Sequence, residues 1–370
     1  MGSDENMAIK DENTSCSRIG VAVVASELSP RFGIEAATLS LVDVLARCYS
    51  VRVITIADAE PEDFVDTQAT LESWGRKVAG WKRVVTVLRA FRHRNDLRDN
   101  VIILSGVWAA VPMLCVLPKQ FRMRTIVWEH AFSSAQVRSL KKLRILRALA
   151  RPLYARAFAI VSVSESLRSD MRSAGFDGAI EVIPNITRTF ESGDTARVVA
   201  RRLLTIGSLD KRKNQALALR ALALLPTDYS LDVLGNGPER TALENLATEL
   251  GIADRVNFYG FVSNPAEYYA RAQCVIHPSL TETYGLVFFE AAGFRKPVVA
   301  LNRGVMRETI PQFVSGLLAE ADPGDFAAAI LSLETNPVSD KEFTDAERRR
   351  DARAQKIVHD WQLLINSAAS

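Results

Sequence analysis

The chain has few of the residues that mark disulfide-rich or zinc-bound proteins. Its 370 residues include only four cysteines, which form no Cys-x-x-Cys pair: Cys16, Cys48, Cys115 and Cys274. Cysteines scattered in this way argue against a disulfide scaffold and against a structural zinc site. Three of them lie in apolar or strand-like surroundings, so we expect buried free thiols and a reducing compartment.

One uncharged run is long enough to be weighed as a membrane span. Residues 101–118 form an 18-residue stretch without a charged side chain, at the lower limit for crossing a bilayer. Gly106 and Pro112 interrupt it, so we interpret it as a buried strand followed by a short helix that ends before Pro118. Residues 1–15 are polar and acidic with no secretory core, which predicts a disordered N-terminus and a cytoplasmic location.

The chain also has little net charge. Its 46 Lys and Arg nearly balance 43 Asp and Glu, for a formal net charge of +3 at pH 7, so we expect no nucleic-acid partner. The positive charge is concentrated in a basic block, residues 76–156, which holds 18 Lys and Arg against Asp96, Asp99 and Glu129. A block of this size indicates an anionic partner for one part of the molecule.

Two interpretations of the basic block stay open. Apolar residues share one helical face over 81–91, and Leu146, Leu149 and Leu153 share another, apart from the face that carries arginines Arg144, Arg147 and Arg151. These patterns predict ordinary amphipathic helices packed on a sheet with solvated charges. Alternatively, they attach the protein peripherally to an anionic membrane that holds a lipid acceptor. Other polyanions are a remaining class, although no aromatic and glycine pattern of a nucleic-acid module accompanies the charge.

Strand-like runs alternate with helical patterns along nearly the whole chain. With 48% hydrophobic and 24% charged residues, the composition is that of a globular protein with sizeable cores. Strands are predicted over residues 19–26, 51–57, 101–104, 125–128, 159–163, 181–183, 203–206, 230–234, 256–259, 274–277 and 297–301, and helices over residues 36–48 and 215–225. Short uncharged strands separated by helices predict parallel sheets covered on both faces.

The alternation stops once and restarts, which predicts two domains. The fold class is therefore α/β, with Rossmann-like, doubly wound parallel-sheet domains over residues 16–191 and 196–345. A polar linker covers residues 192–195, and a C-terminal helix, residues 346–370, crosses back to the first domain. Two such domains place a ligand cleft between them, at the carboxyl ends of the strands.

The most specific pattern in the chain runs from His277 to Pro297, with the sequence HPSLTETYGLVFFEAAGFRKP. It predicts a strand, a loop that holds Glu282, and a helix that carries Glu290 more than one turn from its start. Gly285 allows close approach to the backbone, and the N–H groups of a helix N-terminus suit a phosphate. A carboxylate further along the helix can accept hydrogen bonds from vicinal hydroxyls, as in ribose recognition. We interpret His277 as a structural strand residue.

On these residues the sequence resembles the retaining nucleotide-sugar glycosyltransferases of the GT-B fold, specifically glycosyltransferase family 4. The E-x7-E motif of that family corresponds to Glu282 and Glu290. Further segments match in the expected order over nearly the whole chain: Gly33-Ile34-Glu35, Trp128-Glu129-His130, Gly207–Asn214, Gly235–Pro238 and Gly260–Val262. Phe32, Ile186 and Ser208 depart from the residues usual in the family.

The resemblance implies transfer of a sugar from a UDP- or GDP-linked donor to a hydroxyl of an acceptor glycan or lipid-linked substrate, with retained anomeric configuration. The leaving phosphate is the base in this family. Lys213 would neutralise the diphosphate leaving group, and Glu282 would bond the donor sugar or its phosphate-proximal groups. His130 would point at the donor sugar and the acceptor. These are the candidate catalytic residues.

The resemblance also implies a set of donor-binding residues. Glu290 would hold the ribose hydroxyls, and backbone N–H groups of the helix start would face the diphosphate or the sugar. Ser208 stands where the family has an arginine, so either Ser208 contributes only a hydrogen bond, or Arg212 or Lys211 substitutes. The full donor-binding set is Gly33, Ser208, Phe261, Val262, Tyr284, Gly285, Leu286 and Glu290.

No cofactor and no metal are expected. The chain has no Asp-x-Asp, the pattern expected where carboxylates hold a divalent cation on a diphosphate. Lys213 and the helix N-terminus can supply the positive charge instead. Two alternatives stay open: a nucleotide-sugar epimerase of the same architecture, and a catalytically silent protein that binds a membrane or another polyanion.

Overall fold

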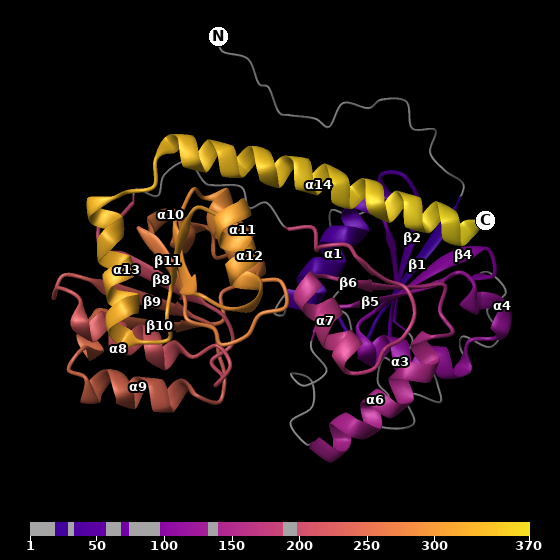
Figure 1. Ribbon diagram of the computed structural model, residues 1–370, viewed down its shortest axis with the longest axis horizontal. Coiled ribbons are helices and arrows are strands. Elements are labelled where there is room, and N and C mark those ends of the chain that lie inside the picture. Colours follow the sequence, from indigo (N-terminus) through magenta and orange to yellow (C-terminus); the bar gives the residue numbers. More distant parts are fainter. Residues whose placement is uncertain (1–18, 29–32, 57–67, 74–96, 132–139, 188–197) are drawn as a thin grey trace, which may run out of the picture.

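The computed structural model describes residues 19–28, 33–56, 68–73, 97–131, 140–187 and 198–370. Within them the chain forms two parallel β-sheets flanked by helices (Figure 1). The predictions for residues 1–15, Phe32, the helical face over 81–91 and the linker 192–195 lie outside the described residues.

The first sheet has seven strands in the order β3-β2-β1-β4-β5-β6-β7, and every neighbouring pair is parallel. Its strands are β1 (Gly20–Ala25), β2 (Ser50–Thr55), β3 (Thr70–Ser73), β4 (Asn100–Ser105), β5 (Thr125–Glu129), β6 (Ala159–Ser162) and β7 (Ile180–Val182). We refer to this sheet and its helices as the first domain.

The second sheet has six strands in the order β10-β9-β8-β11-β12-β13, again with parallel neighbours. Its strands are β8 (Arg202–Ile206), β9 (Ser230–Leu234), β10 (Val256–Gly260), β11 (Cys274–His277), β12 (Val298–Leu301) and β13 (Gly316–Ala319). We refer to this sheet and its helices as the second domain.

Helices connect the strands and lie beside the sheets, as parallel strand pairs require. In the first domain these are α1 (Gly33–Ala46), α3 (Val107–Val116), α4 (Lys119–Arg122), α6 (Leu140–Tyr154) and α7 (Glu165–Ser173). In the second domain they are α8 (Gln215–Leu224), α9 (Arg240–Glu249), α10 (Ala266–Arg271), α11 (Leu286–Gly293), α12 (Gly304–Phe313) and α13 (Pro323–Thr335).

The predicted α/β class with two parallel-sheet domains is confirmed, and so is the interpretation of residues 101–118 as strand β4 followed by helix α3. Strands β3 and β13 were not predicted, because each is a four-residue strand with a mostly half-buried pattern. The cysteine prediction was partly wrong: Cys274 is buried, but Cys48 is half-buried and Cys115 is exposed on α3.

The last helix, α14 (Asp340–Ala369), runs along both domains (Figure 1). It begins six residues earlier than the predicted boundary at residue 346. The reason is a capping box, in which the Ser339 hydroxyl accepts from the Glu342 N–H and the Glu342 carboxylate accepts from the Ser339 N–H. Near its start Arg350 donates to the carbonyl of Phe313 in the second domain. Near its end Tyr49 of the first domain donates to Asn366.

Because all strands within each sheet are parallel, their carboxyl ends share one edge of that sheet. Three loops leave these edges carrying predicted site residues. His130 follows β5, the segment 207–214 follows β8, and the segment 278–285 follows β11. Ligands of open α/β sheets bind at this edge.

Candidate active site

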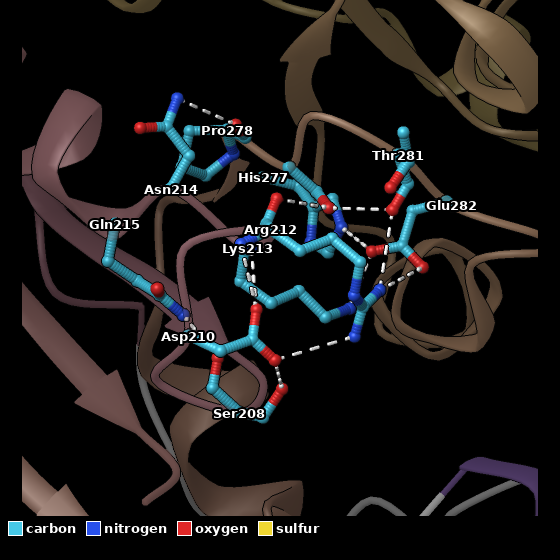
Figure 2. Close-up of polar contacts among 11 residues, drawn as sticks. Ser208, Asp210, Arg212, Lys213, Asn214, Gln215, His277, Pro278, Thr281 and Glu282 are labelled. Atoms are coloured by element: carbon cyan, nitrogen blue, oxygen red, sulfur yellow. Dashed lines mark hydrogen bonds and ion pairs between the residues drawn. The ribbon is translucent and has the colours of Figure 1, made fainter. Parts of the chain in front are cut away.

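Two loops of the second domain meet around the carboxylate of Glu282 (Figure 2). The Lys213 ammonium lies 2.5 Å from Glu282 Oε1, and His277 Nε2 lies 2.9 Å from the same oxygen. Arg212 Nη1 lies 3.8 Å from the other oxygen, Oε2, and also donates to the carbonyl of Thr281. One buried carboxylate thus gathers two cations and an imidazole.

Asp210 shapes the loop that presents Lys213. Its Oδ1 accepts hydrogen bonds from the backbone N–H groups of Arg212 at 2.9 Å and Lys213 at 3.1 Å, while its Oδ2 accepts from the Ser208 hydroxyl at 2.8 Å. Gly207 has a φ of 151°, and a Cβ there would lie 3.3 Å from Lys213 Cε. The Lys213 side chain can therefore pass directly over the glycine.

The electrostatics keep Glu282 ionised. Burial alone would raise the pKa of this carboxyl, which is 8% exposed. The charge of Lys213 and the hydrogen bond from His277 outweigh burial and hold the pKa of Glu282 well below its usual range. Burial is also the main reason why the pKa of His277 is lowered, so a neutral His277 ring donates its Nε2 proton to Glu282.

Gly285 starts the helix that follows. It has a φ of 81°, in the left-handed region, and a Cβ there would lie 2.1 Å from Cε2 of Phe288. Glycine is therefore required at this turn. The N-cap residue Gly285 makes no side-chain capping hydrogen bond, and the first three helical residues, Leu286 to Phe288, are apolar. The predicted positions Gly285 and Leu286 lie at this uncapped end.

Glu290 lies further along α11, and a hydrogen bond from α10 holds its carboxylate. Its Oε2 accepts a hydrogen bond from the hydroxyl of Tyr269 at 2.7 Å, and Tyr269 is fully buried on α10. Burial and the Glu290 charge raise the pKa of Tyr269 far above its usual value, so Tyr269 stays a donor. Beyond the end of β10, Phe261 is 43% exposed and Val262 is half-buried.

His130 marks the corresponding edge of the first domain. It is 3% exposed at the end of β5, and its Nε2 lies 3.0 Å from the Ser105 hydroxyl. Its Nδ1 is buried and has no hydrogen-bond partner among the residues that the structure describes. Burial lowers its pKa to about 3. The Glu129 carboxylate fixes the turn: its Oε1 accepts from the His130 N–H at 3.1 Å, and its Oε2 accepts from the Tyr154 hydroxyl at 2.8 Å.

The two domains touch beside the start of α11. A Cβ on Gly33, the first residue of α1, would lie 3.6 Å from Cδ1 of Leu286. The hydroxyl of Tyr284 donates to the carbonyl of Asn185 at 2.8 Å. These contacts place the predicted residues Tyr284 and Leu286 of the second domain against the first domain, with Leu286 next to the predicted residue Gly33.

Lys213 and Glu282 are thus in direct contact. Tyr284, Gly285 and Leu286 follow Glu282 in the segment that leads into α11. Ser208 does not reach this carboxylate, because its hydroxyl is bonded to Asp210. Of the residues named as substitutes for the family arginine, Arg212 joins the cluster. His277 was missed as part of the site. Its position five residues before Glu282 on a strand end was the available signal.

Two further properties concern metals and membranes. Among the residues that the structure describes, no three His, Cys, Asp or Glu side chains are grouped so as to hold a metal ion. Within the same ranges, no helix combines the length and the apolar character needed to span a bilayer.

Comparison with known families finds two matches, which together cover most of the chain. Residues 32–186 match the family described as "Glycosyl transferase 4-like domain", and residues 195–350 match "Glycosyl transferases group 1". The two matches fall on the first and the second domain.

Individual relatives and solved structures are consistent with these matches. A lipopolysaccharide core biosynthesis glycosyltransferase of Rhizobium meliloti is 28% identical over 73% of this chain and 85% of its own length. Among solved structures, sucrose-phosphate synthase from Thermosynechococcus elongatus has a TM-score of 0.77 at 20% identity, covering 95% of this chain and all of its own. HepE of Anabaena, in complex with UDP-glucose, has a TM-score of 0.71 at 18% identity, covering 92% and 99% of the two chains.

Proposed function

Because this chain is a glycosyltransferase of the GT-B fold, we propose that it moves a sugar from a nucleoside-diphosphate sugar to an acceptor hydroxyl with retention of anomeric configuration. The observation that carries the proposal is the contact of Lys213 with Glu282 beside the uncapped start of α11. Both matched families are glycosyl transferases, which favours this function over the epimerase and over a catalytically silent protein.

In the proposed reaction the donor diphosphate lies near the first turn of α11. Lys213 and Arg212 balance its charge, which grows as the bond between the sugar C1 and the phosphate oxygen breaks. The acceptor oxygen forms the new bond to C1 on the same face, and the acceptor proton goes to the leaving phosphate. Glu282 stays ionised and accepts hydrogen bonds from hydroxyls of the donor sugar.

The remaining donor contacts follow from the positions of the side chains. One carboxylate oxygen of Glu290 accepts the hydrogen bond from Tyr269, and the carboxylate also accepts hydrogen bonds from the ribose hydroxyls. The exposed loop at Phe261 and Val262 contacts the base. Gly33 approaches the donor from the first domain, since no side chain separates its backbone from Leu286. No metal takes part in this proposal, because two cationic side chains and a helix N-terminus meet the same need.

The experiment is a thermal-shift panel of UDP-, GDP- and ADP-sugars, each with and without EDTA. A UDP-sugar is the first donor to test, because the Anabaena protein was solved with UDP-glucose. A ligand that binds only the native state raises the Tm by mass action. A shift for one base that survives EDTA supports the donor site; no shift for any donor contradicts it. Proton NMR of the product's anomeric position then tests retention, and an inverted product contradicts it.

We propose further that the acceptor is a glycan or lipid-linked substrate at an anionic membrane surface reached by α6. Ile145 and Leu149 on this helix are 60% and 52% exposed, next to the exposed arginines Arg144 and Arg151. The sequence had placed Leu149 on the packed face, and that expectation was wrong. An exposed apolar pair flanked by arginines suits an interfacial helix. Arg147 and Arg151 each lie 3.9 Å from an acidic side chain, that of Asp170 and Asp177 respectively, but the Arg147 side chain is only 29% exposed whereas that of Arg151 is 48% exposed.

Liposome sedimentation tests this surface. Arg144→Ser with Arg151→Ser, or Ile145→Ser with Leu149→Ser, should weaken binding to vesicles that contain anionic lipid while leaving donor binding unchanged. Arg348→Ser with Lys341→Ser on α14 removes the same charge elsewhere on the surface and is the control. If all variants bind these vesicles equally well, α6 is an ordinary amphipathic helix without a membrane-binding role.

A further inference from the structure

A line of hydrogen bonds leads from α1 to the imidazole of His130. The hydroxyl of Thr38 donates to the carbonyl of Ile34 at 2.8 Å, and the same oxygen lies 2.8 Å from the hydroxyl of Ser105. Ser105 Oγ in turn lies 3.0 Å from His130 Nε2. Thr38, Ser105 and His130 are all buried, with exposed fractions of 0%, 3% and 3%. They come from α1, β4 and the residue after β5.

The number of available hydrogens fixes the direction of this line. Each of the three contacts is attractive only with one hydrogen between its atoms, because two lone pairs at such distances repel. The Ile34 carbonyl supplies no hydrogen, and Thr38 and Ser105 carry one hydroxyl hydrogen each. Thr38 gives its hydrogen to Ile34, so Ser105 must give its own to Thr38. The third hydrogen, between Ser105 and His130, must come from Nε2 of His130.

This leaves one state for the His130 ring. It is neutral because it is buried, with its pKa lowered to about 3. A neutral imidazole carries a single N–H, so the proton on Nε2 leaves Nδ1 with an open lone pair. Nδ1 is also buried and has no hydrogen-bond partner in the described part of the chain. A buried acceptor of this kind calls for a donor that the described residues do not supply.

We propose that Thr38 and Ser105 are positioning residues that hold His130 as its Nε2–H tautomer, so that Nδ1 accepts a hydrogen bond from a substrate hydroxyl. This inference rests on the proposed sugar transfer for the identity of that hydroxyl. A lone pair excludes phosphate oxygens, which are also acceptors, and favours a hydroxyl, which can donate a hydrogen bond. The ring cannot turn away easily, because Trp128 packs on it with ring centroids 4.1 Å apart.

The first test needs no substrate. In the apo enzyme labelled with 15N-histidine, two-bond nitrogen–proton correlations tell which ring nitrogen of His130 carries the proton. We expect Nε2–H in the wild type. In Thr38→Val, the Ser105 hydrogen loses its acceptor and turns to His130 Nε2, which moves the ring proton to Nδ1. Thr38→Ser keeps the hydroxyl and should restore Nε2–H. A wild-type ring protonated on Nδ1, or an unchanged tautomer in Thr38→Val, overturns the proposal.

The second test asks whether the tautomer matters for transfer. Thr38→Val should lower kcat about tenfold, the effect of one neutral hydrogen bond, and Thr38→Ser should recover most of it. Thr125→Val is the matched control, since Thr125 is a buried threonine whose hydroxyl also bonds a carbonyl, that of Phe121. If Thr38→Val folds poorly, Ser105→Ala tests the same series of hydrogen bonds, because it removes the hydroxyl that accepts from His130 Nε2. A changed tautomer with unchanged kcat overturns the catalytic half of the inference. Failure of the proposed function itself would appear as absence of transfer by the wild type.

Discussion

Trp361 of α14 packs edge-on against Trp128 of β5, with ring centroids 5.3 Å apart and an angle of 80° between the rings. Both indoles are fully buried, and Trp128 also contacts the ring of His130, with centroids 4.1 Å apart. Helix α14 thus contributes to the core that packs against His130. A shift of α14 against the first domain would therefore be transmitted to His130 through the rings of Trp361 and Trp128.

Replacing Trp361 with alanine should cost about 3–5 kcal/mol of unfolding free energy, the usual range for a buried tryptophan. Urea unfolding of both variants measures this. Trp108→Ala is the control, because Trp108 is 54% exposed, and it should change stability by less than about 0.5 kcal/mol. Similar losses for the two substitutions would show that α14 does not complete the core of the first domain.

Lys213→Met and Glu282→Gln should each lower kcat/KM for transfer about 10²- to 10³-fold, the range for removing a charged group that faces the transition state. Both variants should stay folded, because His277 and Arg212 remain next to Glu282 when Lys213 is lost. Steady-state kinetics and thermal unfolding measure the two effects. Lys341→Met removes an exposed charge on α14 and should leave transfer unchanged. Near-normal turnover by Lys213→Met would contradict the assignment of the site.

Stability should fall as the pH drops below about 6.5, in part because of His130. Its pKa is about 3 in the folded protein, against an ordinary histidine pKa of 6.5. Between these pH values the side chain of residue 130 is protonated in the unfolded chain but not in the native state, so acid favours unfolding. From pH 6.5 to about pH 5 the cost is about 2 kcal/mol. His130→Gln should lose correspondingly less over the same interval in urea unfolding. Equal slopes for both proteins would argue against a neutral, buried His130.

Glu282 adds a second, more acidic window. Its folded pKa is lowered from 4.5, so its stabilising contribution is complete above that value and disappears as the pH falls below it.

Gly285→Ala should weaken donor binding and destabilise the protein by about 1–3 kcal/mol, since its Cβ would overlap Phe288 and its φ is left-handed. Gly293, the last residue of the same helix, has open space around an added Cβ. Gly293→Ala should therefore be neutral or slightly stabilising. Isothermal titration with the donor identified in the thermal-shift panel, together with urea unfolding, compares the two. Matching behaviour of the two alanine variants would contradict the role given to the turn.

The strands and their parallel arrangement were predictable because most buried strands are short runs without charged residues, as in β4 (Asn100–Ser105) and β6 (Ala159–Ser162). The candidate site was predictable where residues are close in sequence, as from Glu282 to Glu290. Contacts between residues far apart in the sequence were harder to predict, because only the fold of the sheet brings such residues together. Lys213 lies 69 positions before Glu282, and Ser105 lies 67 after Thr38.

Side-chain direction explains the remaining differences. Helical periodicity grouped Leu146, Leu149 and Leu153, yet Leu149 is 52% exposed and Leu153 is 7% exposed. The packed face of α6 is decided by its neighbours α3 and α7, which periodicity does not contain. His277 has the appearance of a strand residue in the sequence, and only the turn after β11 brings Glu282 back to its ring.

The course of α14 has a consequence for synthesis on the ribosome. The strands of the first domain are translated early, but the side chains that cover part of that domain, including Trp361, Leu364 and Ile365, are translated late. Domains of larger proteins tend to fold in the order of synthesis. Here the first domain keeps an uncovered apolar surface around Trp128 until α14 has emerged and docked. The first domain is therefore completed only after the second domain and α14 have been synthesised.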